Sequence, residues 1–233
     1  MGVISIQNQR NYTMRKSIIV SLIIGLFIVA NPFNAHSQLF LGGKIGGTSS
    51  SLTATGLEQF QPTPKMYFNG GIASSFSFSK RFALELELNY SGKGSAIQYY
   101  GEYETWRGLI KLDQKLHYFA IPLMLQFKMG DRDNYFHFDA GVVSNTLIGS
   151  KFIGDITIEK QNGDVENHEI EIDFNPLKSD FSYAFGIGLM ANGIAFDFRY
   201  EVGTREVYLA EPNSPKIYNR AFLITVGYMI NLL

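Results

Sequence analysis

The sequence predicts an all-β protein, an up-and-down antiparallel barrel of eight strands that crosses a membrane. Three observations lead to this prediction. Eight segments alternate between apolar and other residues with a period of two, as strands do. The connections between these segments are alternately short and long. Beyond the first 37 residues, no segment holds the run of about 20 apolar residues that a spanning helix needs.

The first 37 residues have the three parts of a secretory signal. A positive pair, Arg15 and Lys16, precedes an apolar run at 17–30, and a small-x-small cleavage site follows at 35–37. The apolar run has 14 residues, which is short of the roughly 20 that cross a bilayer as a helix. We therefore predict cleavage before Gln38 rather than a membrane anchor.

Two domains follow from this interpretation. Residues 1–37 are the predicted signal peptide, and residues 38–233 are the predicted barrel. Met14 is an alternative start, because residues 1–13 are polar and add nothing to the signal.

Composition excludes several classes of protein. The chain has no cysteine, which excludes disulfides, cysteine metal ligands, cysteine nucleophiles and a lipoprotein anchor. Its net charge of −1 gives no general basic surface, so we expect no nucleic-acid partner. Aromatic residues make up 14% of the chain and glycines number 23, which favours strands joined by tight turns.

Each predicted strand is close to the roughly 10 residues that a tilted strand needs to cross a membrane. The eight strands are, in order, Leu39–Thr48, Tyr67–Phe78, Phe82–Ser91, Leu116–Met129, Phe136–Ile148, Phe181–Ala191, Ile194–Thr204 and Asn219–Leu232.

The connections predict two different rims. Short turns are expected at 79–81, between Gly130 and Tyr135, and at Asn192-Gly193, where both residues suit the positive φ of a two-residue hairpin. Barrels of the outer membrane have short periplasmic turns and long external loops. The predicted long loops are 49–66, 92–115, 149–180 and 205–218.

Two of the long loops carry further patterns. In the third, Asp155-Ile-Thr-Ile-Glu and Glu169-Ile-Glu-Ile-Asp flank Asn162-Gly163, which predicts a hairpin projecting beyond the rim with solvated charges. A calcium site is an alternative for these acids, but the spacing of an EF-hand is absent from the sequence. The second loop holds aromatic residues that either form a contact surface or fold over the barrel mouth. They are Tyr99, Tyr100, Tyr103 and Trp106.

The alternation separates two faces. In the third strand, leucines such as Leu86 share one face and Glu85 and Glu87 the other. A soluble barrel would point the leucines inward, whereas a membrane barrel points them outward. Small residues on the polar face and aromatic residues at strand ends favour the membrane barrel. These aromatics are Phe78, Phe82, Phe127, Tyr135 and Phe136 at the short-turn rim, and Tyr67, Tyr90, Tyr183, Tyr200 and Tyr218 near the long loops.

The inward face collects charged residues. Eight strands leave an interior just wide enough for side chains, and buried charges need partners. We therefore predict a paired network that fills the lumen; a selective pore or a proton path is the alternative. The members are Lys44, Glu85, Glu87, Lys128, Asp139, Asp197, Arg199 and Glu201, with His137 beside them.

Histidines are the candidates for catalysis. His117 is in phase with the outward face at the long-loop rim, where a base acting on lipid would need to lie. Nothing near it in the sequence identifies a serine partner, although triads assemble across space. His168 lies in the acidic third loop. We assign no catalytic, cofactor-binding or metal-binding residue and predict a protein that is not an enzyme.

Four stretches resemble the PorT-like outer-membrane β-barrel family of Gram-negative bacteria. They are FLGGKIGG at 40–47, FSFSKRFALELELNYSGKGS at 76–95, HYFAIPLMLQFK at 117–128 and FHFDAGV at 136–142. The resemblance implies an eight-stranded barrel in the outer membrane. It also implies a link to protein export, because the named member is associated with the type IX secretion system.

Two functional hypotheses follow. In the first, the protein is a non-enzymatic barrel in contact with outer-membrane lipid. Its role is structural, partner-binding or secretion-supporting, and its external loops contact other envelope or secretion proteins. In the second, it is a small pore or a lipid-modifying enzyme of the outer membrane.

Overall fold

The computed structural model describes residues 38–55, 62–103, 106–160, 165–171, 176–208 and 216–232. The chain divides into two compact units, Met1–His36 and Ser37–Leu233, and every described residue belongs to the second. The predicted secretory signal therefore lies outside the described residues. In the part that is described, no helix has the length and apolar character needed to span a membrane.

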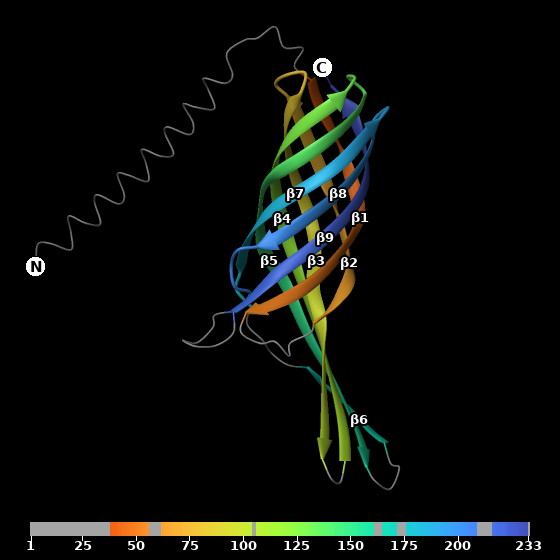
Figure 1. Cartoon of the computed structure of the whole chain (residues 1–233), viewed down its shortest axis with the longest axis vertical. Coiled ribbons are helices and arrows are strands. Elements are labelled where there is room, and N and C mark those ends of the chain that lie inside the picture. Colours follow the sequence, from red (N-terminus) through yellow and green to blue (C-terminus); the bar gives the residue numbers. More distant parts are fainter. Residues whose placement is uncertain are drawn as a thin grey trace, which may run out of the picture. The chain divides into compact units, whose positions relative to one another are not determined.

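Eight antiparallel strands close into a barrel, as the sequence predicts (Figure 1). The pairing order is β4-β3-β2-β1-β9-β8-β7-β5, and β5 pairs back to β4. The ninth strand, β6, pairs with β5 outside this ring. The strands are β1 (Gln38–Thr55), β2 (Thr63–Ser77), β3 (Phe82–Tyr103), β4 (Trp106–Gly130), β5 (Asn134–Lys160), β6 (Val165–Glu171), β7 (Ser179–Ala191), β8 (Ile194–Gly203) and β9 (Lys216–Asn231).

The short turns lie together at one rim, which we call the short-turn rim. The hairpin between β7 and β8 has φ of 49° at Asn192 and 85° at Gly193, so the two-residue turn is confirmed. The seam between the first and last strands also reaches this rim, where Phe40 pairs with Asn231. We call the opposite end the long-loop rim.

The predicted second and third loops are wrong, because their backbone is mostly strand. β3, β4 and β5 have 22, 25 and 27 residues, whereas β7 and β8 have 13 and 10. The three long strands continue past the long-loop rim and, with β6, form a projecting four-stranded sheet (Figure 1). We call this sheet the blade; it comprises 97–103, 106–112, 153–160 and Val165–Glu171.

The hairpin predicted in the third loop is confirmed within the blade. Asp155 pairs with Glu169, and Glu159 pairs with Val165. Asn162 and Gly163, the predicted turn, lie outside the described residues. So do the side chains of the second-loop aromatics, and both alternatives for those aromatics remain predictions.

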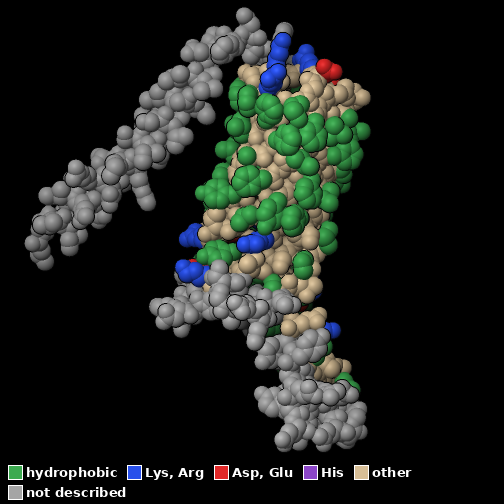
Figure 2. Space-filling model, in the orientation of Figure 1, with side chains coloured by type: hydrophobic (Ala, Val, Ile, Leu, Met, Phe, Trp, Pro, Cys, Tyr) green, Lys and Arg blue, Asp and Glu red, His purple; other side chains and the backbone are tan. Residues whose placement is uncertain are grey.

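The two faces of the wall lie as the membrane interpretation requires. Leu86 is 45% exposed and Leu123 is 40% exposed, whereas Glu85 and Glu87 are 3% and 2% exposed. Figure 2 shows hydrophobic side chains spread over the face of the wall that is in view, with lysine and arginine toward its two ends. The alternation therefore separates an apolar exterior from a polar lumen.

An apolar layer occupies the lumen next to the short-turn rim. It consists of Phe40, Ala73, Tyr135, Met190, Ala195 and Met229, each at most 4% exposed. The prediction of Tyr135 as an interfacial aromatic is wrong. Tyr135 is in phase with His137 and Asp139, so it points inward with them.

Candidate functional site in the barrel lumen

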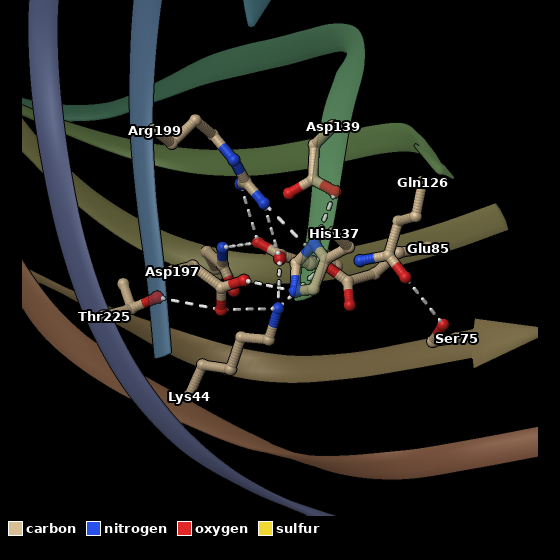
Figure 3. Close-up of polar contacts among 11 residues, drawn as sticks. Lys44, Ser75, Glu85, Gln126, His137, Asp139, Asp197, Arg199 and Thr225 are labelled. Carbon is tan, nitrogen blue, oxygen red and sulfur yellow. Dashed lines mark hydrogen bonds and ion pairs between the residues drawn. The ribbon is translucent and has the colours of Figure 1, made fainter. Parts of the chain in front are cut away.

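Seven charged or titratable side chains meet in the lumen, and we call them the central cluster (Figure 3). Alternation along β1, β3, β5 and β8 turns all of them inward, and each is at most 6% exposed. The members are Lys44, Glu85, Glu87, His137, Asp139, Asp197 and Arg199.

Two cations hold the carboxylates of β3. The Lys44 Nζ atom lies 2.8 Å from Glu85 Oε1, 3.1 Å from Glu87 Oε1 and 3.0 Å from Asp197 Oδ2. The Arg199 guanidinium donates two hydrogen bonds to Glu87, with Nη1···Oε2 at 3.1 Å and Nη2···Oε1 at 2.9 Å. This two-pronged geometry is the stronger form of ion pair, and burial makes each partner depend on the other.

His137 completes the cluster on the β5 side. Its Nδ1 atom lies 2.8 Å from Asp139 Oδ1, and its Nε2 atom lies 3.5 Å from Asp197 Oδ1. The Thr225 hydroxyl donates to Asp197 Oδ2 at 3.4 Å. Two cations thus face four carboxylates, so the cluster has a formal net charge of −2 when His137 is neutral.

Lys128, predicted as part of the same network, lies apart from the central cluster. Its Nζ atom donates to Ser77 Oγ at 2.7 Å. It also sits 4.2 Å from the centre of the Tyr135 ring and 5.4 Å from that of Phe40. The ammonium group therefore lies against aromatic faces in the apolar layer as well as bonding to Ser77.

Glu201 also lies apart, in a second ion pair that the sequence analysis missed. Lys93 Nζ lies 2.8 Å from Glu201 Oε2 and 3.3 Å from Asn145 Oδ1. Lys93 is 1% exposed, although it stands between two glycines in a predicted loop. Lys93 is an even number of residues from Glu85 and Glu87, so a continuous strand would place all three on the inward face.

A third polar group, also missed, lies toward the long-loop rim. Asn219 Nδ2 donates to Asp180 Oδ2 at 3.1 Å and to the Tyr118 hydroxyl at 3.5 Å. All three side chains are buried. Asp180 precedes a predicted strand by one residue, so extending that strand would have placed it in the lumen.

His117, on the outer surface, contacts a different kind of residue from the serine or carboxylate that a catalytic histidine of a hydrolase contacts. His117 Nδ1 is in hydrogen-bond contact with the Tyr90 hydroxyl, and the two rings stack at 5.8 Å. Among the described residues, His117 thus makes its polar contact with a phenol rather than with a serine or a carboxylate. This is an interfacial aromatic pair on the apolar face.

Several solved structures of bacterial surface and outer-membrane proteins are similar to the chain. Solved structures that resemble the chain include Ail, the attachment invasion locus protein of Yersinia pestis (12% identity, 82% of this chain and 98% of that chain, TM-score 0.38). The outer membrane protein OprG from Pseudomonas aeruginosa matches with 12% identity over 85% of this chain and 99% of its own, at a TM-score of 0.41. Neisserial surface protein A matches with 9% identity over 82% of this chain and 96% of its own, at a TM-score of 0.37.

No curated protein matches the chain. The family model described as "Outer membrane protein beta-barrel domain" matches residues 30–207, which is more than half of the sequence. The chain therefore belongs to the outer membrane protein beta-barrel domain family, and it is a transmembrane β-barrel of the outer membrane.

Proposed function

We propose that this protein is a non-enzymatic, non-conducting barrel that holds the blade outside the cell as a partner-binding surface. The observation that carries the proposal is the continuation of β3, β4 and β5 past the long-loop rim. With the short turns on the periplasmic side, as in other barrels of this membrane, the blade projects outward.

The blade has two open edges that suit an added strand. The pairing of β2 with β3 ends at Thr63 and Ala96, so in the described residues the rest of β3 pairs with β4 alone. On the other edge, the described partner of β6 is β5. An open edge offers backbone donors and acceptors to an extended segment of another chain.

The side chains of β6 indicate what such a segment should carry. Val165 is 56% exposed, and Glu166 and His168 are also exposed. The strand sequence Val-Glu-Asn-His-Glu-Ile-Glu holds three acidic residues and no lysine or arginine. Charge complementarity therefore favours an extended protein segment with basic residues.

The lumen supports the non-conducting part of the proposal. Its ion pairs lie at successive levels above an apolar layer of side chains that are at most 4% exposed. A narrow interior filled by paired side chains leaves no wide aqueous path. Planar-bilayer recording should show no large, steady conductance; a stable open level would favour the pore instead.

The resemblance to PorT-like proteins suggests the first partners to test, which are components of protein export in the envelope. Residues 1–37 would then serve as a cleaved secretory signal that delivers the barrel. Amino-terminal sequencing of the protein from outer membranes should begin at Gln38, and an intact start would contradict cleavage.

Site-specific photo-crosslinking in living cells tests the blade as the binding surface. A photoreactive residue replaces Val165 on β6, and a matched one replaces Leu86, which faces lipid. We expect discrete protein adducts at 165 and none at 86. Adducts at neither position, with the barrel normally inserted, would contradict a partner-binding blade.

A further inference from the structure

Three side chains of the central cluster lie close together on the β5 and β8 side of the lumen. His137, Asp139 and Asp197 each offer one nitrogen or carboxylate oxygen, and these atoms lie within 4.8 Å of one another. The three residues are 2%, 5% and 6% exposed. Asp197 also contacts Lys44 through its other oxygen, with Lys44 Nζ 3.0 Å from Asp197 Oδ2.

Asp139 fixes the orientation and tautomer of the imidazole. Its Oδ1 atom lies 2.8 Å from His137 Nδ1, so in the neutral ring the proton sits on Nδ1. The lone pair then belongs to Nε2, on the opposite side of the ring. A carboxylate that orients histidine through its second nitrogen is a regular feature of metal sites.

The free nitrogen points at an oxygen that lacks a hydrogen bond. Asp197 Oδ1 is buried and, among the described residues, accepts no hydrogen bond. It faces His137 Nε2 at 3.5 Å. Two acceptors facing one another in a buried site are unfavourable unless a proton or a cation lies between them.

The separation of these two atoms fits a cation. Zinc binds imidazole nitrogen and carboxylate oxygen at about 2.0–2.2 Å, so two ligands in tetrahedral geometry lie roughly 3.3–3.6 Å apart. The observed 3.5 Å between His137 Nε2 and Asp197 Oδ1 is in that range.

The strand between the two ligands leaves room for their approach. Gly188 of β7 pairs with His137 on one side and with Asp197 on the other. A Cβ atom at Gly188 would lie 2.4 Å from His137 Nε2 and 2.7 Å from Asp197 Oδ1. The missing side chain therefore lets the two groups meet above the strand.

We propose that His137 Nε2 and Asp197 Oδ1 bind one divalent transition-metal ion such as Zn²⁺. Asp139 orients the imidazole through its contact with Nδ1. Imidazole with carboxylate selects such ions over Mg²⁺ and Ca²⁺, which prefer oxygen ligands throughout. A divalent ion also balances the net charge of −2 on the central cluster. The site is structural and completes the filled lumen.

The apolar layer determines how the ion enters. Tyr135, Met190 and Ala195 each stand two residues from a member of the trio or from Gly188, on the side of the short-turn rim. They separate the site from that rim. On the other side, the buried ion pair of Lys93 and Glu201 occupies the lumen. We therefore expect the ion to enter before the barrel closes and to exchange slowly afterwards.

Metal analysis of the whole protein tests the proposal. The protein is purified in detergent from outer membranes, unfolded with chelator, and refolded with Zn²⁺, with Co²⁺ or without metal. Free metal is removed, and gel mobility with and without heating reports folding. We expect about one equivalent of metal per folded chain, which resists chelator until the barrel is unfolded.

Variants locate the ion. His137→Gln and Asp197→Asn should each lower the retained metal from about one equivalent to near zero. Glu201→Gln, which alters a buried carboxylate of the other ion pair, should retain it. No retained metal in the wild type, or equal retention in all variants, would overturn the proposal.

A spectroscopic measurement on the wild type covers the case in which a variant does not fold. X-ray absorption of the Zn²⁺-loaded protein should show imidazole scattering with nitrogen at about 2.0–2.1 Å. Oxygen scattering alone would contradict the proposed ligands. Nitrogen NMR that shows a doubly protonated His137 ring in the metal-supplied protein would assign the bridge to a proton and overturn the proposal.

Discussion

The wall of the barrel and the blade share β3, β4 and β5, but their side chains meet different surroundings. In the wall, β4 pairs on both sides and separates Leu123, which faces lipid, from Met124, which is fully buried. In the blade, β5 and β6 are joined across the strands by polar contacts such as Thr157 Oγ1 to Asn167 Oδ1 at 2.9 Å. The difference shows that period-two alternation in the wall reflects lipid on one side and the lumen on the other.

The wall should also carry nearly all of the stability. Its strands are paired on both sides and enclose buried ion pairs, whereas the blade has open edges and exposed side chains such as Val165. Segments with few buried contacts open at low cost. Four substitutions or deletions, from the largest expected effect to the smallest, test this contrast.

The largest loss is expected from removal of the guanidinium in the lumen. Arg199→Ala leaves Glu87 buried without its two-pronged partner, which should lower the free energy of unfolding by about 3–5 kcal/mol. Urea titration of the barrel in lipid measures this, with the exposed Arg220→Ala as the control. An unchanged midpoint for Arg199→Ala would mean that the lumen is hydrated rather than closely packed.

A charge on the lipid-facing side should cost somewhat less. Leu123→Arg places an arginine among acyl chains and should destabilise the barrel by about 2–4 kcal/mol if the position is near the midplane. Ile148→Arg, at an exposed position near the long-loop rim, should cost less than about 1 kcal/mol. Equal costs at the two positions would contradict the assignment of Leu123 to the middle of the lipid-facing surface.

The turn between β7 and β8 should contribute a smaller amount. Gly193→Ala forces a side chain into a backbone with φ of 85° and should cost about 1–2 kcal/mol. Gly43→Ala is the matched control, because a Cβ there would meet nothing closer than the Gly71 carbonyl at 3.7 Å. Equal stability of the two variants would show that the turn adjusts freely.

Removal of the blade should affect the barrel least. A variant in which short turns replace 97–110 and 153–172 should insert normally and keep nearly the same free energy of unfolding. The same variant should lose any partner captured at Val165. A barrel that fails to insert without the blade would show that the two regions fold as one unit.

The sequence predicts the wall well because lipid and lumen impose opposite demands on alternate residues. It predicts the blade only in part: the alternating runs in the third loop indicate the hairpin of β5 and β6, whereas 97–103 and 106–112 carry no such alternation. The second long loop is predicted to begin at Gly92, yet the chain continues as strand through Gly92 and Gly94, with Gly94 at a φ of 143°.

For the candidate site, too, the sequence predicts one aspect and not another. Phase along each strand shows which residues point inward, and it would have identified Lys93 had the third strand been extended. Phase cannot show which inward residues meet. Arg199 contacts Glu87 across 112 positions of sequence, and closure of the ring brings them together.

The seam between β1 and β9 has a consequence for the time course of assembly. Phe40 and Asn231, which pair there, are separated by almost the whole barrel sequence. Closure must therefore wait until the last strand has been delivered, and contacts so distant in sequence form slowly. Until β1 and β9 pair with each other, both are exposed edges, and each is able to pair with the wrong chain. Between export and closure the protein is consequently open to mispairing and aggregation. During that interval it depends on periplasmic factors that cover unpaired strands.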